Sequence, residues 1–487
     1  MSFSSPAFLF LFLPVVLSGY VLLRGLAARN LFLLAASLLF YAWGEGAHAL
    51  LLMVSIALNH QLGGWVARAR VGDEGGAGWW TPRRVIALTV AVNVALLGVF
   101  KYSPFLVTNF NVLLGAAGMA PLSVPRVHLP IGLSFFTFQA MSYVFDVHMQ
   151  KADVQRNPLN MALYVALFPQ LILGPIVRYR HIAEQLTARV VGAEDFARGA
   201  SRFTLGLGKK VLIADTLAIA ADGIFAIPPG ELTPGLAWLG VLCFTLQLYH
   251  DFSAYSDMAI GLGRMLGFHF RENFRYPLLA RTRTEYFRRW HISFFTWMRD
   301  YVYIPLCGKD CPRWRANVNV MLVWLLAGLW HGASWTFIIW GAANGLLIIV
   351  ERLWVQPAFR YVWWPLQHVY SIALTMAGMV LFRAGSMAQA GAFYAGMAGI
   401  AGGDGVAWHA GMFLHGELAL VLTLGLLGAG PVFPWLVGRL RALLGGGEQA
   451  ETAPFLGLAG CWVALVLAAS AMTIAARTYT PFVYFQF

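Results

Sequence analysis

The chain has 487 residues, of which 59% are apolar and only 11% are charged. Ordinary soluble domains carry about 25% charged residues, so the composition argues against a cytosolic globular enzyme. Its 34 Lys and Arg exceed its 22 Asp and Glu by 12. In a chain with long uncharged stretches, this excess is typical of cytoplasmic loops near an anionic leaflet rather than of nucleic-acid binding. The sequence therefore predicts an all-α, polytopic integral membrane protein.

Apolar runs recur along the whole chain. They centre near residues 15, 37, 55, 92, 138, 168, 213, 243, 325, 343, 374, 425 and 465. A helix needs about 20 apolar residues to cross the hydrocarbon core, and we expect about 11 to 13 membrane segments, some of them re-entrant. The polar connections are nearly all short, which favours one membrane domain over residues 1–487, with N-terminal spans (1–125), a core (126–355) and C-terminal spans (356–487).

Basic residues in the first part of the chain predict its orientation. The first apolar run, 6–23, has no basic residue before it and leads into Arg24 and Arg29, which is the reverse of a cleavable signal peptide. We therefore expect a retained first span with its N-terminus outside. Two apolar runs later, the connection at 68–84 is basic again. Because two spans return the chain to the same side of the membrane, we place both basic connections in the cytoplasm.

The middle of the chain is highly charged. Residues 264–310 contain nine Lys and Arg against four Asp and Glu, so this segment must lie at the membrane interface or line a protein-walled cavity. Arg288, Arg289 and Arg299, with Trp290 among them, are candidates for binding the phosphates of an acyl carrier or coenzyme. The alternative is that these arginines anchor lipid headgroups.

An uncharged run of 35 residues, 316–350, follows. As one helix it would be about 52 Å long, against a hydrocarbon core of about 30 Å. Gly328, Gly332 and Ser334 interrupt it around His331, which predicts a broken or re-entrant segment with the histidine near its middle. An ionisable side chain at that depth indicates a functional site, and a neutral imidazole suits general-base work. The alternative is a core histidine hydrogen-bonded to a neighbouring helix.

Other polar residues have weaker signals. His291 follows Arg288 and Arg289 and is either part of the site or an interfacial histidine among arginines. Asp251 and Asp257, six residues apart, could orient a polar site, but their spacing assigns no role. Four cysteines do not make a disulfide scaffold, and Cys307 and Cys311 lack the second ligand pair that zinc requires. No metal site is predicted.

Several strings along the chain resemble the membrane-bound O-acyltransferases, and within them the bacterial alginate O-acetylase type. The histidines lie in two of these strings, Arg288 to Ser293 and Leu329 to Gly332. The similar strings occupy residues 130–139, 168–170, 174–178, 251–263, 287–306, 328–335 and 484–487. Independent strings in the expected order over nearly the whole length make this resemblance specific.

The resemblance implies a multi-helix fold with re-entrant helices around a central tunnel. In it, an acetyl group from a cytoplasmic donor, acetyl-CoA or another thioester, meets an acceptor on the far side of a bacterial inner membrane. It implies catalytic roles for His331 and His291, with Trp330, Asp251 and Asn344 placed along the tunnel. It also implies a periplasmic esterase-like (SGNH-type) partner and a polysaccharide acceptor, with no permanently bound cofactor.

Three positions depart from the family pattern: Arg271, where proline is usual, Cys307, where glycine is usual, and Asn344, where another histidine is frequent. They leave both central histidines intact but leave the polymer open between alginate, peptidoglycan and cellulose. Whether His331 acts as a base or carries the acyl group is also open.

Two other functions of the chain remain as alternatives to acyl transfer: a transporter for an acyl donor or glycan, and a scaffold that only holds the partner.

Overall fold

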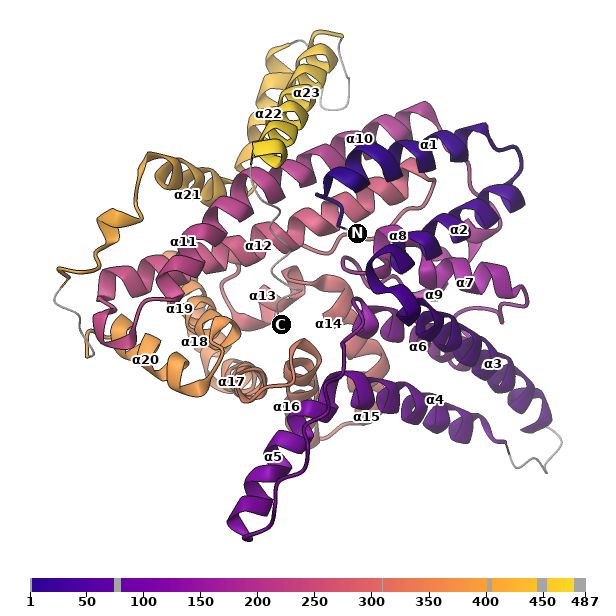
Figure 1. Ribbon diagram of the computed structural model, residues 1–487, viewed down its shortest axis with the longest axis horizontal. Helices are drawn as coiled ribbons and strands as arrows, with labels where there is room; N and C mark the ends of the chain where they lie inside the picture. The colour runs from indigo at the N-terminus through magenta and orange to yellow at the C-terminus, as the bar shows by residue number, and fades with distance from the viewer. Residues whose placement is uncertain (1, 74–79, 309, 401–404, 445–452, 477–487) are drawn as a thin grey trace. The chain divides into compact units, whose positions relative to one another are not determined.

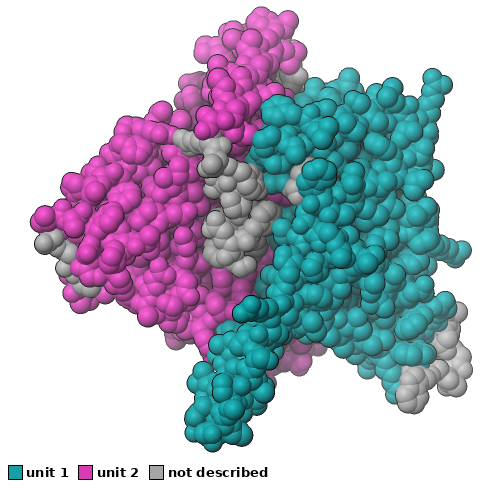
Figure 2. Space-filling view, viewed as in Figure 1, with its two compact units in different colours: residues 1–200, 259–271 teal, residues 201–258, 272–487 magenta. Residues whose placement is uncertain are grey.

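The computed structural model describes residues 2–73, 80–308, 310–400, 405–444 and 453–476. Within these residues the secondary structure is helical, without strands, which confirms the expected all-α class. The chain forms two compact units, residues 1–200 with 259–271 and residues 201–258 with 272–487 (Figure 2). The predicted string at 484–487 lies outside the described residues, and the predicted three-part division of a single domain stays a prediction.

The first unit contains the N-terminal helices (Figure 1). Pro158 starts α7 directly after Asn157, whose side chain accepts a hydrogen bond from the Leu159 N–H and so caps the helix. The helices of this unit are α1 (Leu13–Leu22), α2 (Leu26–Glu45), α3 (Ala49–Asp73), α4 (Pro82–Leu97), α5 (Ser103–Ala116), α6 (Leu133–His148), α7 (Pro158–Ala166), α8 (Phe168–Leu171) and α9 (Tyr179–Ile182). Two further helices, α10 (Ala193–Gly208) and α12 (Pro234–Met265), begin in one unit and end in the other.

The second unit contains the segments with the predicted histidines. Thr282 caps α13 by accepting from the Glu285 N–H, in the Thr-x-x-Glu pattern that marks helix starts. The helices of this unit are α11 (Asp215–Phe225), α13 (Arg283–Arg289), α14 (Ile292–Met298), α15 (Ile304–Cys307), α16 (Arg313–His331), α17 (Trp335–Val350), α18 (Gln356–Phe359), α19 (Trp364–Arg383), α20 (Met387–Met397), α21 (Gly416–Gly428), α22 (Val432–Leu443) and α23 (Ala453–Ala476).

Five helical segments of the described chain are long and apolar enough to cross a membrane, and a bent pair makes up to six. The five are Leu26–Arg70, Pro82–Ala116, Trp335–Phe359, Trp364–Arg383 and Ala453–Ala476, and the pair α21 and α22 bends by 75°. The chain is therefore a multi-pass membrane protein. The expected total of 11 to 13 segments, which includes shorter and more polar runs, stays a prediction.

The predicted break near His331 is confirmed as a tight turn between α16 and α17. The helices lie side by side (Figure 1) and antiparallel, with Gly328 and Gly341 facing each other. A Cβ at Gly328 would lie 2.3 Å from the Phe337 carbonyl oxygen, and one at Gly341 would lie 2.4 Å from the Trp324 carbonyl oxygen. Only glycine permits this approach of the two backbones. The hairpin places His331 at the last residue of α16.

Candidate functional site

His331 lies in a box of aromatic rings. Its side chain is buried, and the ring centroids of Trp330, Trp340, Phe382 and Phe294 lie 5.1, 5.2, 5.2 and 5.6 Å from its own. These rings come from α14, α16, α17 and α19, so four helices of the second unit fix the imidazole. Apolar surroundings disfavour a charged imidazole, as a base or nucleophile requires.

A small enclosed cavity of about 10 Å³ lies against His331. This is about the volume that one water molecule needs. Three residues of its lining carry buried polar atoms that have no hydrogen-bond partner within the described residues: Arg283 Nε, Tyr286 Oη and Trp340 Nε1. Buried polar groups are nearly always paired, so three residues with unpaired polar atoms in one lining mark this cavity as a candidate binding site.

His291 lies close to His331 through shared neighbours. Its ring is fully buried, and Phe294 and Trp330 lie 5.2 and 5.9 Å from it. Its backbone has φ of 45°, in the left-handed region, immediately before α14. A non-glycine residue in that region costs free energy and persists where the surroundings impose it, frequently at active sites.

Asn273 fixes the tautomer of His291. Its side-chain oxygen accepts from the Ser293 N–H at 3.2 Å and from the Ser293 hydroxyl at 2.8 Å, and it lies 3.2 Å from His291 Nδ1. Because a backbone N–H can only donate, this atom is the amide oxygen, and Nδ1 must carry the proton. Burial lowers the pKa of His291 to about 3, so the ring is neutral at physiological pH with its lone pair on Nε2.

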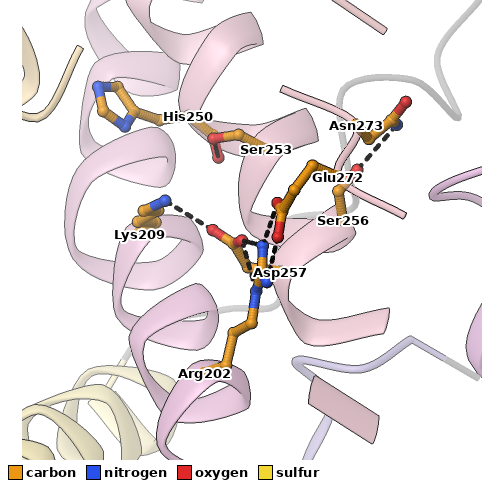
Figure 3. A network of polar contacts seen from close by, with 8 residues as sticks. All are labelled: Arg202, Lys209, His250, Ser253, Ser256, Asp257, Glu272 and Asn273. Carbon is orange, nitrogen blue, oxygen red and sulfur yellow. Dashed lines mark hydrogen bonds and ion pairs between the residues drawn. The ribbon is translucent and has the colours of Figure 1, made fainter. Parts of the chain in front are cut away.

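Ion pairs hold the segment before His291 in place (Figure 3). Arg202 binds both Asp257 and Glu272, at 2.8 and 2.6 Å, and Lys209 binds Asp257 at 2.6 Å. Glu272 directly precedes Asn273, whose amide nitrogen donates to the Ser256 hydroxyl at 3.1 Å. Asp257, one of the two predicted aspartates, therefore belongs to this support rather than to the cavity.

Arg283 is a fully buried cation beside the cavity. Its guanidinium donates to Thr375 Oγ1 at 2.6 Å and to Asn344 Oδ1 at 2.9 Å, and its backbone N–H donates to Glu351 Oε1 at 2.6 Å. Asn344, which is predicted to line a tunnel, is not part of the cavity lining. It contacts Arg283, which is. The sequence pattern does not single out Arg283, because Arg281, Glu285, Arg288 and Arg289 surround it in the same charged segment.

The four predicted donor-binding residues do not lie together. Arg288 and Arg299 line one open groove of about 550 Å³, and Arg352 adds a third cation to it. Arg289 instead pairs with Glu285 at 2.7 Å, and Trp290 is buried and lines the cavity beside His331. The structure therefore brings Arg288 and Arg299 together but not Arg289 and Trp290.

The remaining predicted residues also have assigned contacts. Trp330 contacts both histidine rings. Asp251 is buried and lies 2.9 Å from Lys210 Nζ, which also contacts Asp215 at 2.8 Å. Asp251 is not part of the cavity lining, so its predicted place along a tunnel remains untested.

A helical membrane protein that buries two histidines beside unpaired donors, with a basic groove on the same unit, has the parts of an enzyme that transfers an acyl group. Comparisons with known proteins agree with this class. Residues 104–382 match the membrane-bound O-acyltransferase family. The chain is 39% identical to the probable alginate O-acetylase AlgI of Pseudomonas putida, and the match covers the whole length of both proteins.

Two other relatives support the same family. The chain is 44% identical to the probable alginate O-acetylase AlgI of Azotobacter vinelandii, over 82% of the chain and 78% of that protein. It is 34% identical to the peptidoglycan O-acetyltransferase of Helicobacter pylori, over 82% and 80%. The chain belongs to the membrane-bound O-acyltransferase family, which confirms the resemblance and the expectation of an acyltransferase.

We expect Asn273→Leu to lower acyl transfer about as much as His291→Ala does, and roughly tenfold or more, because the tautomer and the orientation of His291 depend on the Asn273 oxygen. Acetyl ester formed by membranes of each variant, at matched protein levels, is the measurement. The double variant should lose little more than either single one, since residues acting as one unit are non-additive. Additive losses would contradict a shared role.

Proposed function

We propose that this chain is an O-acetyltransferase that passes acetyl groups from a cytoplasmic thioester donor across a bacterial inner membrane, for O-acetylation of a polysaccharide outside it. The observation that carries the proposal is the placement of His331, buried at the turn of the α16–α17 hairpin against a cavity with unpaired polar atoms. A base or nucleophile, a site for an oxygen atom and a basic groove then lie within one unit.

Two routes through His331 balance atoms and charge. In one, Nε2 or Nδ1 of the neutral ring takes the proton of the acceptor hydroxyl, the oxygen attacks the thioester carbonyl, and the thiol leaves with a proton. In the other, the ring nitrogen attacks the thioester carbonyl and the thiolate leaves; the acceptor hydroxyl then takes the acetyl group from the imidazole, and its proton ends on the thiolate. Each route forms a tetrahedral oxyanion that N–H donors stabilise.

Arg283 and Trp340 are suited to stabilise that oxyanion. Both line the cavity, and their Nε and Nε1 atoms are the unpaired buried donors described above. Arg283 also supplies positive charge in surroundings of low polarity, where electrostatic interactions are strong. Asn344 and Thr375 hold the guanidinium in this place.

The groove fits the polar part of a coenzyme or carrier thioester. Arg288, Arg299 and Arg352 would bind its phosphates, and the volume of about 550 Å³ is within the range of small-molecule sites. Phe287 lines both the groove and the cavity beside His331. A thioester arm from the groove would therefore reach His331 past this one ring.

The acceptor is proposed from the relatives. Two of them are named as probable alginate O-acetylases and one as a peptidoglycan O-acetyltransferase, so the proposed acceptor is a cell-envelope or extracellular polysaccharide of the alginate type, with peptidoglycan or cellulose as alternatives. A periplasmic esterase-like protein would complete the system by placing the acetyl group on the polymer.

We expect His331→Ala to abolish detectable polymer acetylation, since loss of a general base costs roughly 10²- to 10⁴-fold. The measurement is the ester content of extracted glycans from a deletion strain complemented with wild type or variant at matched membrane levels. His409→Ala, which removes an exposed histidine elsewhere, is the control and should restore acetylation fully. The fraction that regains ester identifies the polymer.

Normal acetylation with His331→Ala would contradict the assignment and leave the chain as a conduit or scaffold. Labelled acetyl donor that accumulates inside vesicles without covalent transfer would favour the transporter.

We expect Trp340→Phe to lower kcat roughly tenfold or more while leaving KM for the donor nearly unchanged, because it removes one N–H from the oxyanion site and keeps a ring in the aromatic box. Initial rates at varied donor concentration separate the two constants. A raised KM with unchanged kcat would assign Trp340 to binding instead.

We expect Arg288→Gln and Arg299→Gln each to raise KM for acetyl-CoA several-fold with little change in kcat, because each removes one phosphate contact in the groove. Inverted membrane vesicles supplied with acetyl-labelled acetyl-CoA provide the measurement. Arg289→Gln is the matched control, since Arg289 pairs with Glu285 and does not line the groove. An equal effect of all three substitutions would contradict the groove as the donor site.

A further inference from the structure

A second group of metal-binding side chains lies in the first unit. Among the described residues, Glu45, His48 and His128 offer one carboxylate oxygen and two imidazole nitrogens that all lie within 4.8 Å of one another. The Glu45 side chain is 3% exposed and that of His128 is 60% exposed. The group therefore combines the buried carboxylate of Glu45 with the exposed imidazole of His128, which metal ions in solution can reach.

Hydrogen bonds already orient two of the three ligands. His48 Nδ1 lies 3.1 Å from the Glu45 carbonyl oxygen, which can only accept, so Nδ1 carries the proton and Nε2 carries the lone pair. Ligating histidines usually donate their other N–H to such a carbonyl. His128 Nε2 lies 3.0 Å from Glu45 Oε2, and the two histidine rings are 4.9 Å apart.

The distances suit a small transition metal ion. Ligand atoms about 2.0 to 2.2 Å from a tetrahedral zinc ion lie about 3.4 Å from each other, whereas the ligand atoms of the group lie within 4.8 Å of one another, so its longest side needs to contract by at most about 1.4 Å. One exposed histidine makes this adjustment feasible. Two nitrogens and one oxygen disfavour calcium and magnesium, which take oxygen ligands.

The group ties two parts of the first unit together. Glu45 ends α2 and His48 lies in the turn before α3, whereas His128 lies in the extended segment that leads to α6. Tyr41 donates to the Ile131 carbonyl at 3.1 Å and makes a second tie between the same parts. A metal ion here would fix the entry of the chain into α6.

The group lies just before the first residues of α3 and α6. Arg70, near the end of α3, donates to the Val147 and His148 carbonyls at the end of α6 at 3.2 and 3.0 Å. The start of α6 and His128 therefore lie at the same end as Glu45.

We propose that Glu45, His48 and His128 bind one divalent transition metal ion of the zinc class in the first unit. Three protein ligands leave a fourth position for water or for an oxygen of a bound molecule. The proposal is independent of the acyl-transfer site, whose residues belong to the second unit.

Metal content of the purified full-length chain tests the proposal. The protein is isolated with a non-histidine affinity tag, stripped with a chelator, reloaded with zinc and assayed for bound metal by mass spectrometry and for affinity by titration calorimetry. We expect about one equivalent in the wild type, and an affinity lower by more than about tenfold in His128→Gln and His48→Gln. X-ray absorption at the zinc edge should show imidazole nitrogens among the ligands.

His409→Gln is the matched control because it removes an exposed histidine of the second unit. It should bind as the wild type does. His128 is exposed, so its substitution leaves the fold intact and keeps the test decisive if His48→Gln fails to fold. Binding in His128→Gln equal to the wild type, or absence of stoichiometric zinc from the wild type, would overturn the proposal. Copper or nickel ions bind most nitrogen and oxygen sites more tightly than other divalent ions do. Tighter binding of either ion than of zinc would therefore support the site, provided that His128→Gln lowers that affinity as well.

Discussion

The site depends on how polar side chains are satisfied inside an apolar helical protein. Away from water, each buried donor or acceptor must find its partner within the protein or remain unpaired at a cost of about 1 to 3 kcal/mol. Most buried groups of the second unit meet this demand in pairs or chains. Arg202 holds Glu272, Glu272 precedes Asn273, and Asn273 fixes His291. Three residues with an unpaired buried polar atom, Arg283, Tyr286 and Trp340, line one cavity together with His331.

The two histidines are held in place by different contacts. His291 is fixed at its backbone by a left-handed conformation and at its ring by Asn273, so the protein sets both its tautomer and its orientation. His331 is enclosed by aromatic rings from four helices, and these rings fix its position.

The sequence predicted the parts of the site that depend on local pattern. Glycines around His331 predicted the break, and the string 288–293 singled out His291. Arg288 and Arg289 were grouped because they adjoin, but successive residues of a helix point about 100° apart, and only Arg288 lines the groove. Asn273, Arg283 and Thr375 could not be found in the same way, because their partners lie 18 to 92 residues away. Glu45 and His48 have a helical spacing, but His128 joins them only through the fold.

Phe287 then decides how groove and cavity can work together. Its ring lies 4.3 Å from Trp324 in the groove and 6.2 Å from Trp340 in the cavity. The helix that carries it has seven residues and is fixed at both ends, by Glu351 at Arg283 and by the Arg275 N–H at the Arg289 carbonyl. These bonds hold the backbone of the helix that brings Phe287 to both the groove and the cavity and Arg283 to the cavity.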